Sequence, residues 1–533
     1  MIKQLTAKID GRNMENDSEI IEAILDSRGI EDIAKFLKPE IEDMISFDKL
    51  KGLDEAYRII DDAVTMGERF LVLADVDADG CCSNAIITRY LRKCGAEVEC
   101  IINDGKVHGA EHLDLSLLDD IDVMIIVDSL NNDPDVYQRI INTGTKLVVF
   151  DHHLPEPRLL DANLDFVLVS SANDYPNEHL SGAGVCMKYV LYADEMNLTD
   201  YSDDLWVYAA IGLIADMSSM AEPENRYMAY RGLAQFRNPM VQKMVGNYTF
   251  DSQSVSFSIG PLVNAAMRMH ENEKAMNVFL AEDEDEIDEL VKDLKNCRED
   301  QNNVVAELLD GLLEQGESQL DRKCMFFMLD NDTDAEITGL IGNKLLAMYQ
   351  RPLFILKRRD GQYAGSMRSM GTENFLEIAN GTGLCLCQGH PNAAGAFIDV
   401  NDFEQFQAVI EEELKDIEFS VNIEADIELA PHQVNENLIK QLNAINRVSG
   451  NGFSPVKILI RTDDYEVSTF STKKHLKIID NETGVIIVKW NCMDWQTLGN
   501  DGEIVAVGVL SNPYYGRNKF LQLTIDDYTQ QND

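Results

Sequence analysis

The chain has 533 residues and a formal net charge of −47 at pH 7, and 45% of its residues are hydrophobic. This length exceeds what one hydrophobic core supports, so about two to four domains are expected. No apolar run approaches the roughly 20 residues of a membrane span. The charge argues against a nucleic-acid binder that relies on overall attraction, although a metal centre or a few focused cations can dominate a local groove.

The N-terminal half is expected to hold a helical segment followed by an α/β domain. Residues 1–65 are predicted to be helical, with a break at Pro39. Residues 66–220 alternate apolar strand-like runs with helical stretches, the pattern of a doubly wound domain with a parallel sheet, and residues 221–275 are mostly helical. The predicted helices are Ser18–Leu25, Glu31–Leu37, Leu53–Val64 and Cys82–Cys94.

The C-terminal half is expected to hold three further parts. From Asp283 to about Leu320 the sequence is charged and amphipathic, which predicts a long helix linking two lobes. Residues 324–420 resume the strand and helix alternation of a smaller α/β lobe. Residues 455–530 are mostly short β-type runs separated by turns, which predicts a small barrel.

The start of the chain and its cysteines bear on the compartment. The first residues show no secretory signal. The 10 cysteines lack framework spacing, since Cys81 and Cys82 are adjacent and one residue separates Cys385 from Cys387. We therefore expect reduced thiols in a cytoplasmic protein without a membrane partner.

Acidic and histidine residues follow four apolar runs. Because parallel strands bind ligands beyond their carboxyl ends, the residues after the first three runs are expected at one edge of a sheet. After any single run, a solvated loop is the simpler interpretation, but the ordered set favours a site that holds divalent cations. The residues are Asp75, Asp77 and Asp79 after Phe70–Ala74, Asp128 after Val123–Val127, Asp151, His152 and His153 after Leu147–Phe150, and Asp216 after Ala210–Ala215.

The ligand types indicate which metal and which chemistry. Carboxylates with one or two imidazoles suit Mn²⁺ or Mg²⁺ better than a structural zinc site. Two such ions about 3.5–4 Å apart can activate water and stabilise the leaving oxygen of a phosphodiester. The sequence therefore predicts a two-metal phosphoesterase site.

Two later regions carry features that suit nucleic acid. Small residues with Ser, Arg and His donors suit phosphate binding, and they occur at Gly365–Ser369 and Gly389–Gly395. Cations beside aromatic residues suit a single strand, and they recur between Lys473 and Phe520.

These motifs, in this order, resemble those of the DHH phosphoesterase superfamily, and specifically the RecJ-type single-strand exonucleases. The resemblance implies that the metal ligands are Asp77, Asp79, Asp128, His152 and Asp216, with Asp79 and His153 as catalytic residues and His153 beside the scissile phosphate. Asp75 matches an acid that is common in RecJ proteins but is not a direct ligand. The sequence departs from the RecJ pattern at Asn103–Gly109, and Gln388 replaces a usual glycine.

The resemblance also implies which residues bind the substrate. Arg268 is a candidate phosphate contact, with a salt bridge as the equally weighted alternative. The Gly365 and Gly389 segments resemble motifs of the DHH-associated domain, and the last segment resembles an OB domain. The expected substrate-binding residues are Arg268, Ser366, Arg368, Ser369, Gly389, His390, Lys474, Tyr515 and Arg517.

The fold class implied is α/β, with a parallel-sheet DHH lobe, a smaller α/β DHH-associated lobe joined by a long helix, and a C-terminal OB-type β-barrel. The expected boundaries are a helical segment at 1–65, the DHH catalytic domain at 66–275, a linking helix at 276–322, the DHH-associated substrate-binding domain at 323–450 and the OB-fold at 451–533.

The function implied is 5′ to 3′ hydrolysis of single-stranded DNA to nucleoside 5′-monophosphates, in DNA repair, recombination or replication. The expected cofactors are two Mn²⁺ ions, with Mg²⁺ as an alternative. The expected partners are single-stranded nucleic acid, DNA rather than RNA, and a single-strand-binding protein or helicase, and the protein is expected to be a monomer. Two alternatives stay open, namely a phosphodiesterase for short oligonucleotides or cyclic dinucleotides and an inactive scaffold in a replication complex.

Overall fold

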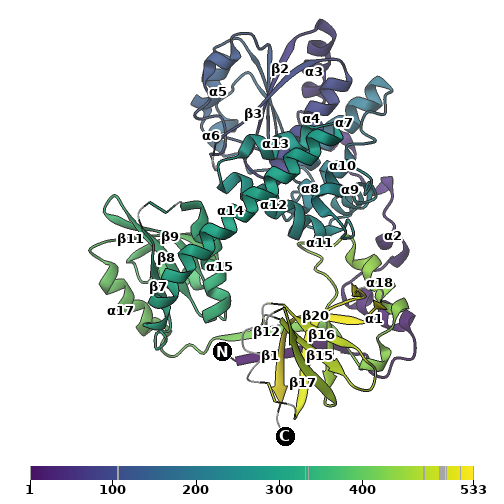
Figure 1. The fold of residues 1–533 in the computed structure, drawn as a ribbon. Helices are drawn as coiled ribbons and strands as arrows, with labels where there is room; N and C mark the ends of the chain where they lie inside the picture. The colour runs from purple at the N-terminus through teal and green to yellow at the C-terminus, as the bar shows by residue number, and fades with distance from the viewer. Residues whose placement is uncertain are drawn as a thin grey trace. The chain divides into compact units, whose positions relative to one another are not determined.

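The computed structural model describes most of the chain (Figure 1). The described residues are 2–104, 107–330, 332–333, 335–471, 475–490, 492, 498–499, 501–515 and 518–531. They form two compact units, each made of separate stretches of sequence. The larger unit contains residues 29–299 and 441–455, and the smaller unit contains residues 1–28, 300–440 and 456–533. No described helix combines the length and apolar character needed to cross a bilayer.

The larger unit is built on a five-stranded parallel sheet with the order β3-β2-β4-β5-β6. The strands are β2 (Arg69–Ala74), β3 (Glu97–Ile102), β4 (Val123–Val127), β5 (Lys146–Asp151) and β6 (Val167–Ser170). Nearly all residues of β2, β4 and β5 are buried, as expected for strands that are covered on both faces.

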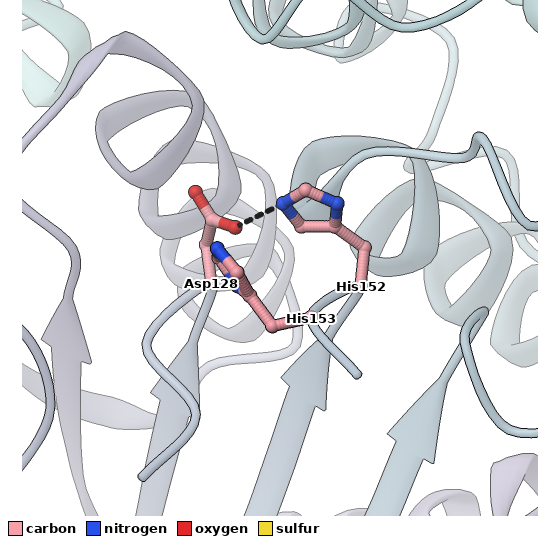
Figure 2. Close-up of side chains that lie close together, drawn as sticks. All are labelled: Asp128, His152 and His153. Atoms are coloured by element: carbon pink, nitrogen blue, oxygen red, sulfur yellow. Dashed lines mark ion pairs between the residues drawn. The ribbon is translucent and has the colours of Figure 1, made fainter. Parts of the chain in front are cut away.

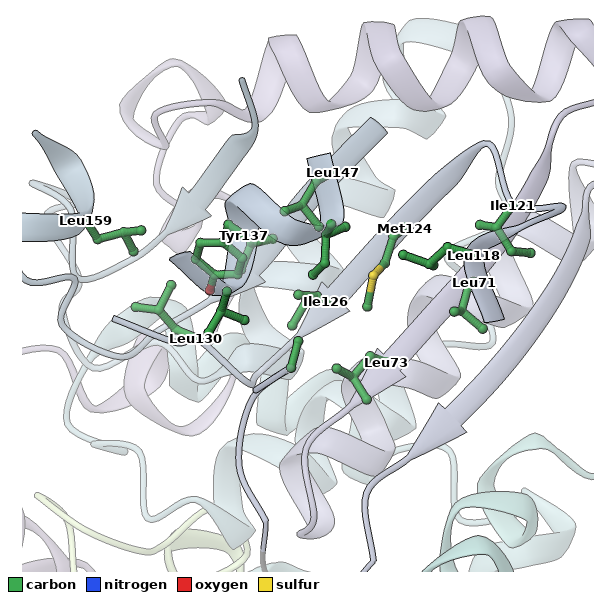
Figure 3. Close-up of a cluster of buried hydrophobic side chains, with 14 residues drawn as sticks. Leu71, Leu73, Leu118, Ile121, Met124, Ile126, Leu130, Tyr137, Leu147 and Leu159 are labelled. Carbon is green, nitrogen blue, oxygen red and sulfur yellow. The ribbon is translucent and has the colours of Figure 1, made fainter. Parts of the chain in front are cut away.

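Helices cover both faces of this sheet (Figure 1). On one face, Leu73, Met124 and Ile126 pack against Tyr137 of α5 (Figure 3). The other face lies against α4, which also packs on α7 and α8. The helices are α2 (Ile33–Leu37), α3 (Leu53–Met66), α4 (Ala78–Lys93), α5 (Pro134–Ile141), α6 (Pro157–Leu160), α7 (Gly182–Asn197), α8 (Trp206–Ala215), α9 (Pro223–Leu233), α10 (Pro239–Val245), α11 (Ser252–Ser254), α12 (Gly260–Arg268) and α13 (Asn272–Leu280), with a π-helical turn at Val255–Ile259.

The smaller unit contains a five-stranded sheet with the order β10-β11-β9-β8-β7, in which only β7 and β8 are parallel neighbours. Helix α14 (Glu284–Glu317) begins in the larger unit, and its later part packs Val305 and Leu312 against Phe327 of β7. The elements are β7 (Met325–Met328), α15 (Thr338–Tyr349), β8 (Leu353–Arg359), β9 (Gln362–Arg368), α16 (Phe375–Gly381), β10 (Cys385–His390), β11 (Ala393–Asp399) and α17 (Phe403–Leu414).

A second sheet of the smaller unit has eight strands in the order β1-β12-β13-β17-β20-β16-β15-β14. Helix α1 (Asp17–Ser27) packs on β1 and β12, helix α18 (Glu436–Asn446) follows β12 along the chain, and β18 (Tyr514–Tyr515) pairs with β19 (Asn518–Lys519). The strands are β1 (Ile2–Asp10), β12 (Ser420–Leu429), β13 (Ile458–Thr462), β14 (Tyr465–Phe470), β15 (His475–Asp480), β16 (Ile486–Lys489), β17 (Glu503–Ser511) and β20 (Gln522–Gln531).

This sheet corrects two expectations from the sequence. The described strands form an open order with β1 and β14 at its edges, and no closed barrel is found among them. Residues 2–10, predicted to be helical, form β1, which pairs in parallel with β12. The physical reason is the alternation of Leu5, Ala7 and Ile9 with exposed residues, which is a strand period; Leu5 and Ala7 pack on a buried cluster of the sheet.

A fully buried ion pair ties α7 to α9 in the larger unit. Lys188 Nζ lies 2.9 Å from Glu224 Oε1, and burial lowers the pKa of Lys188. Three other groups donate hydrogen bonds to the same carboxylate, namely the Tyr175 hydroxyl at 2.8 Å, the Asn177 amide at 3.1 Å and the Ile45 backbone N–H at 3.1 Å. Because the pair is shielded from water, removing one partner leaves the other charge uncompensated.

We expect Lys188→Met to reduce the free energy of unfolding by about 3–5 kcal/mol, the typical loss when one partner of a buried pair is removed. Urea unfolding at a fixed concentration of divalent metal measures this change. Lys243→Met is the matched control, because Lys243 pairs with Asp288 on the surface of the same unit. Equal losses for the two variants would contradict a stabilising role of the buried pair.

Candidate metal centre

The acidic and histidine residues predicted from sequence meet at the carboxyl edge of the parallel sheet. Strands β2, β4 and β5 lie side by side and end at this edge, and Asp216 joins them from the C-terminal end of α8. Among the described residues, three groups have ligand atoms within 4.8 Å of one another: Asp79, His152 and Asp216; Asp128, His152 and His153; and Asp75, Asp77 and Asp128. All five predicted metal ligands therefore belong to one connected cluster.

Helix N-termini hold the first two carboxylates. Asp77 is the N-cap of α4 and accepts a hydrogen bond from Gly80 N at 2.9 Å. Asp79 belongs to the first turn of α4, but its carboxylate faces the start of α7, where it accepts bonds from Gly182 N at 2.8 Å, Ala183 N at 3.0 Å and Ser181 Oγ at 3.0 Å. Backbone amides and the helix dipole favour negative charge there.

Burial nevertheless opposes the charge of these groups. It raises the pKa of Asp77 to about 6 and the pKa of Asp79 well above its usual value, and neighbouring carboxylates add to both shifts. Burial also raises the pKa of Asp128 and of Asp216. A bound cation would remove this penalty, because it compensates several carboxylates at once.

Two glycines allow the backbone to approach these carboxylates. A Cβ atom on Gly212 of α8 would lie 2.3 Å from Asp79 Oδ1, and one on Gly182 would lie 2.7 Å from Asp128 Oδ1. Neither position tolerates a side chain without displacing a carboxylate. The close packing of α7 and α8 against the sheet edge therefore depends on glycine.

Asp128 is the clearest sign that the site fits a cation. Its φ of 58° is unusual for a residue other than glycine, and such strain concentrates at functional sites. Its Oδ1 is buried and receives no hydrogen bond from the described residues, although His152 Nε2 lies 3.1 Å away (Figure 2). Burial lowers the pKa of His152, which favours the neutral imidazole that metal ions bind. Asp128 Oδ1 and His152 Nε2 each carry a lone pair and face one another, an arrangement that suits a divalent metal ion.

Asp151 has a different role from the other acids. Its Oδ1 accepts hydrogen bonds from His153 Nδ1 at 2.8 Å and from the His152 and His153 backbone, and its Oδ2 accepts one from Leu130 N at 2.6 Å. Burial opposes its charge, but these His153 bonds keep the pKa of Asp151 below its usual value. In return, the Asp151 bond raises the pKa of His153 to about 9. The hydrogen bond to Asp151 therefore favours the protonated form of His153 and determines the orientation of its ring.

His108 belongs to the site but was missed in the sequence. Its Nδ1 lies 2.8 Å from Asp75 Oδ1, which also accepts a bond from Ser129 Oγ at 2.9 Å. The Asp75 bond raises the pKa of His108. The sequence held one signal for His108, its position after β3, whose carboxyl end lies at the same sheet edge. It was missed because His108 falls in the stretch that departs from the RecJ pattern.

The predicted phosphate-binding residues of the smaller unit lie on adjacent strands. Ala393 of β11 pairs with Arg368 of β9 on one side and with His390 of β10 on the other, so the three residues form one row across the sheet. Ser366 lies in β9, Ser369 follows directly after this strand, and Gly389 has a φ of 140°. Burial lowers the pKa of Arg368, and its Nε donates to Asn343 Oδ1 at 2.8 Å.

The other predicted substrate residues are not brought into this row. Arg268 is a half-buried residue of α12 in the larger unit. Lys474, Arg517 and the side chain of Tyr515 lie outside the described residues. The predictions for these four residues stay predictions.

Comparison with known proteins identifies two domains in the chain. Residues 69–213 match the DHH family, N-terminal domain, and residues 321–416 match the DHHA1 domain. A putative prophage-derived single-strand DNA-specific exonuclease, YorK, of Bacillus subtilis is 28% identical over 484 residues, which are 83% of this chain and 82% of that protein. The single-stranded-DNA-specific exonuclease RecJ of Bacillus subtilis is 24% identical and covers 95% of this chain and 67% of its own length.

A solved structure agrees over the whole chain. RecJ of Thermus thermophilus in complex with Mn²⁺ superposes with a TM-score of 0.77 at 23% identity and covers 100% of this chain and 80% of its own, which shows a shared fold. The two domain matches, the relatives and the acidic cluster agree with one another. The chain belongs to the DHH phosphoesterase superfamily and is a RecJ-like member of it.

Proposed function

We propose that the protein is a metal-dependent exonuclease that degrades single-stranded DNA from the 5′ end to nucleoside 5′-monophosphates. The observation that carries this proposal is the cluster of Asp77, Asp79, Asp128, His152 and Asp216, in which Asp128 Oδ1 faces His152 without a hydrogen bond. The names of the YorK and RecJ relatives supply the substrate and the reaction class. The direction of digestion rests on the family resemblance.

We propose two ions, with Mn²⁺ preferred, because the ligands combine carboxylates with imidazole. Ions bound there supply a Lewis acid for the phosphate and lower the pKa of an attacking water. The protein's own contribution is to hold the ligands in place before substrate arrives. His153 lies beside the cluster, and Asp151 favours its protonated form, which suits contact with a phosphate oxygen.

We further propose that the row formed by Arg368, Ala393 and His390 holds the phosphate backbone of the strand. His390 is exposed, and its small neighbour Ala393 leaves room above the sheet for the phosphate backbone of a strand. Arginine and histidine donors form charge-assisted hydrogen bonds to phosphate.

The eight-stranded sheet is proposed to serve as the OB-type binding module. Phe470 of β14, His475 of β15 and Trp490, directly after β16, have ring centroids 4.9–5.5 Å apart, and Trp490 is 46% exposed. Lys489, next to Trp490, is less available than the sequence suggested, because it pairs with Asp527 at 2.5 Å. Base stacking would therefore contribute more than charge at this surface.

The first test is digestion of a 5′-labelled single strand, a 3′-labelled single strand and a dinucleotide, each with Mn²⁺ or with EDTA. We expect metal-dependent release of the 5′ label as mononucleotide. Asp128→Asn and Asp216→Asn should lower the rate by more than about a hundredfold, since even changes outside the ligand shell cost 10–100-fold. Asp120→Asn, an exposed change in the same unit, is the control and should retain full activity.

The other outcomes separate the alternative functions. Cleavage of the dinucleotide alone would indicate a phosphodiesterase for short oligonucleotides. No cleavage of any substrate by the folded wild-type protein, with intact metal binding, would indicate a scaffold.

A second prediction concerns pH and follows from the raised pKa of Asp77. Since the folded, metal-free protein holds this proton up to about pH 6, its stability should fall as pH rises from the usual value of 3.8 through 6. The fall should be smaller in Asp77→Asn, because asparagine also caps a helix and does not ionise. The measurement is Tm with EDTA and with Mn²⁺ at pH 5 and pH 7.5; the rise caused by Mn²⁺ should be larger at pH 7.5, and equal rises would refute the assignment.

A third prediction concerns the smaller unit. His390→Ala should weaken single-strand affinity by about tenfold, the loss expected from one charge-assisted phosphate contact. Metal affinity should not change, since the metal cluster lies in the larger unit. His432→Ala, an exposed histidine of the same unit, is the control. Fluorescence anisotropy in Ca²⁺ reports strand binding, and an unchanged affinity for His390→Ala would remove this row from the binding surface.

A further inference from the structure

His108 bridges the ends of two strands at the metal site. Its Nδ1 lies 2.8 Å from Asp75 Oδ1, just after β2, and its Nε2 lies 3.1 Å from the backbone oxygen of Leu130, just after β4. Both partners are acceptors, so the geometry calls for an N–H at both ring nitrogens. A ring that donates at both ends has no free nitrogen with which to accept a proton from water.

Asp75 is thereby held from two sides. Ser129 Oγ donates to the same Oδ1 at 2.9 Å and itself accepts from Gly109 N at 2.8 Å, next to His108. These bonds close a ring that joins the His108 segment to the sheet edge. Since a carboxylate is planar, two hydrogen bonds to one oxygen of Asp75 also fix the position of its second oxygen. An Asp75 oxygen lies within 4.8 Å of oxygens of Asp77 and Asp128.

His108 also contacts His153. The two rings meet edge to face with centroids 5.2 Å apart and planes at 70°. Asp151 holds His153 through Nδ1 at 2.8 Å. The hydrogen bond to Asp151 and the ring contact with His108 together restrict rotation of the His153 side chain.

We propose that His108 is a positioning residue for hydrolysis, which fixes the carboxylate of Asp75 through Nδ1 and the ring of His153 through its edge. This proposal rests on the proposed nuclease function of the same site. His108 does not touch the reacting phosphate. Its effect reaches the reaction through Asp75 and His153, as supporting residues orient the direct ligands of metal sites.

Two isosteric variants separate the two hydrogen bonds. In His108→Asn the amide nitrogen takes the place of Nδ1 and can donate to Asp75. In His108→Gln it takes the place of Nε2 and reaches Leu130 O instead. We expect His108→Gln and His108→Ala to lower kcat by about tenfold or more with little change in KM, whereas His108→Asn should recover most of the loss.

A second readout does not depend on activity. Calorimetric titration of the folded protein with Mn²⁺, without substrate, should show affinity reduced several-fold in His108→Gln and His108→Ala and near wild type in His108→Asn. Ser129→Ala, which removes the other donor to Asp75, should act in the same direction as His108→Gln. If His108→Ala fails to fold, the asparagine and glutamine pair still decides the matter.

The proposal is overturned if His108→Asn is impaired as much as His108→Gln, or if both retain wild-type kcat and metal affinity. It is also overturned if KM rises while kcat is unchanged. A wild-type protein that cleaves no strand would refute the proposed function instead, and the Mn²⁺ titration would still report on His108.

Discussion

The site is organised around one constraint, the free-energy cost of holding several ionised carboxylates close together where water has little access. Asp77, Asp79 and Asp128 share a sheet edge with little access to water, and each has a raised pKa because burial and its neighbours oppose ionisation. Such a cluster persists only where backbone amides, imidazoles or cations compensate the charge. The amides at the start of α4 and α7 provide part of this compensation, and divalent metal would provide the rest.

The local architecture follows from that constraint. Parallel strands bring their carboxyl ends to one edge, so acids far apart in the sequence become neighbours there. Helices α7 and α8 must approach this edge closely, which is why glycine occupies positions 182 and 212, where any Cβ would collide with Asp128 or Asp79. The carboxylate of Asp151 serves the same arrangement differently, because it orients His153 instead of facing the cluster.

The net charge of −47 is compatible with a polyanionic substrate. Most acids lie on solvated surfaces, where they repel polyanions only over about a Debye length of 8–10 Å. The substrate contacts that we propose are therefore short-range ones: the candidate metal cluster, His153, the row of Arg368 and His390, and the aromatic cluster around Trp490. Since Lys489 is already paired with Asp527, aromatic stacking is the interaction that this last surface offers most directly.

Some of this organisation was predictable from sequence because it depends on short-range patterns. Apolar runs followed by acids identify β2, β4 and β5 and place Asp77, Asp128 and His152 at their ends, since strand period and connection handedness leave few alternatives. The long amphipathic stretch likewise predicts α14. The motif order, read as a resemblance, was sufficient to name the superfamily, and the two domain matches confirm it.

Other features were decided only by tertiary structure, because they depend on contacts between residues far apart in sequence. The N-terminal strand β1 needs β12 as a partner, and among the described strands β1 and β14 form the two edges of the eight-stranded sheet. His108 joins the site through residues far away in the sequence, because Asp75, after β2, and Leu130, after β4, accept its two N–H groups. The sequence by itself therefore determined which residues could bind metal; the packing of distant segments decided how those residues are oriented, since orientation depends on neighbours that no local pattern specifies.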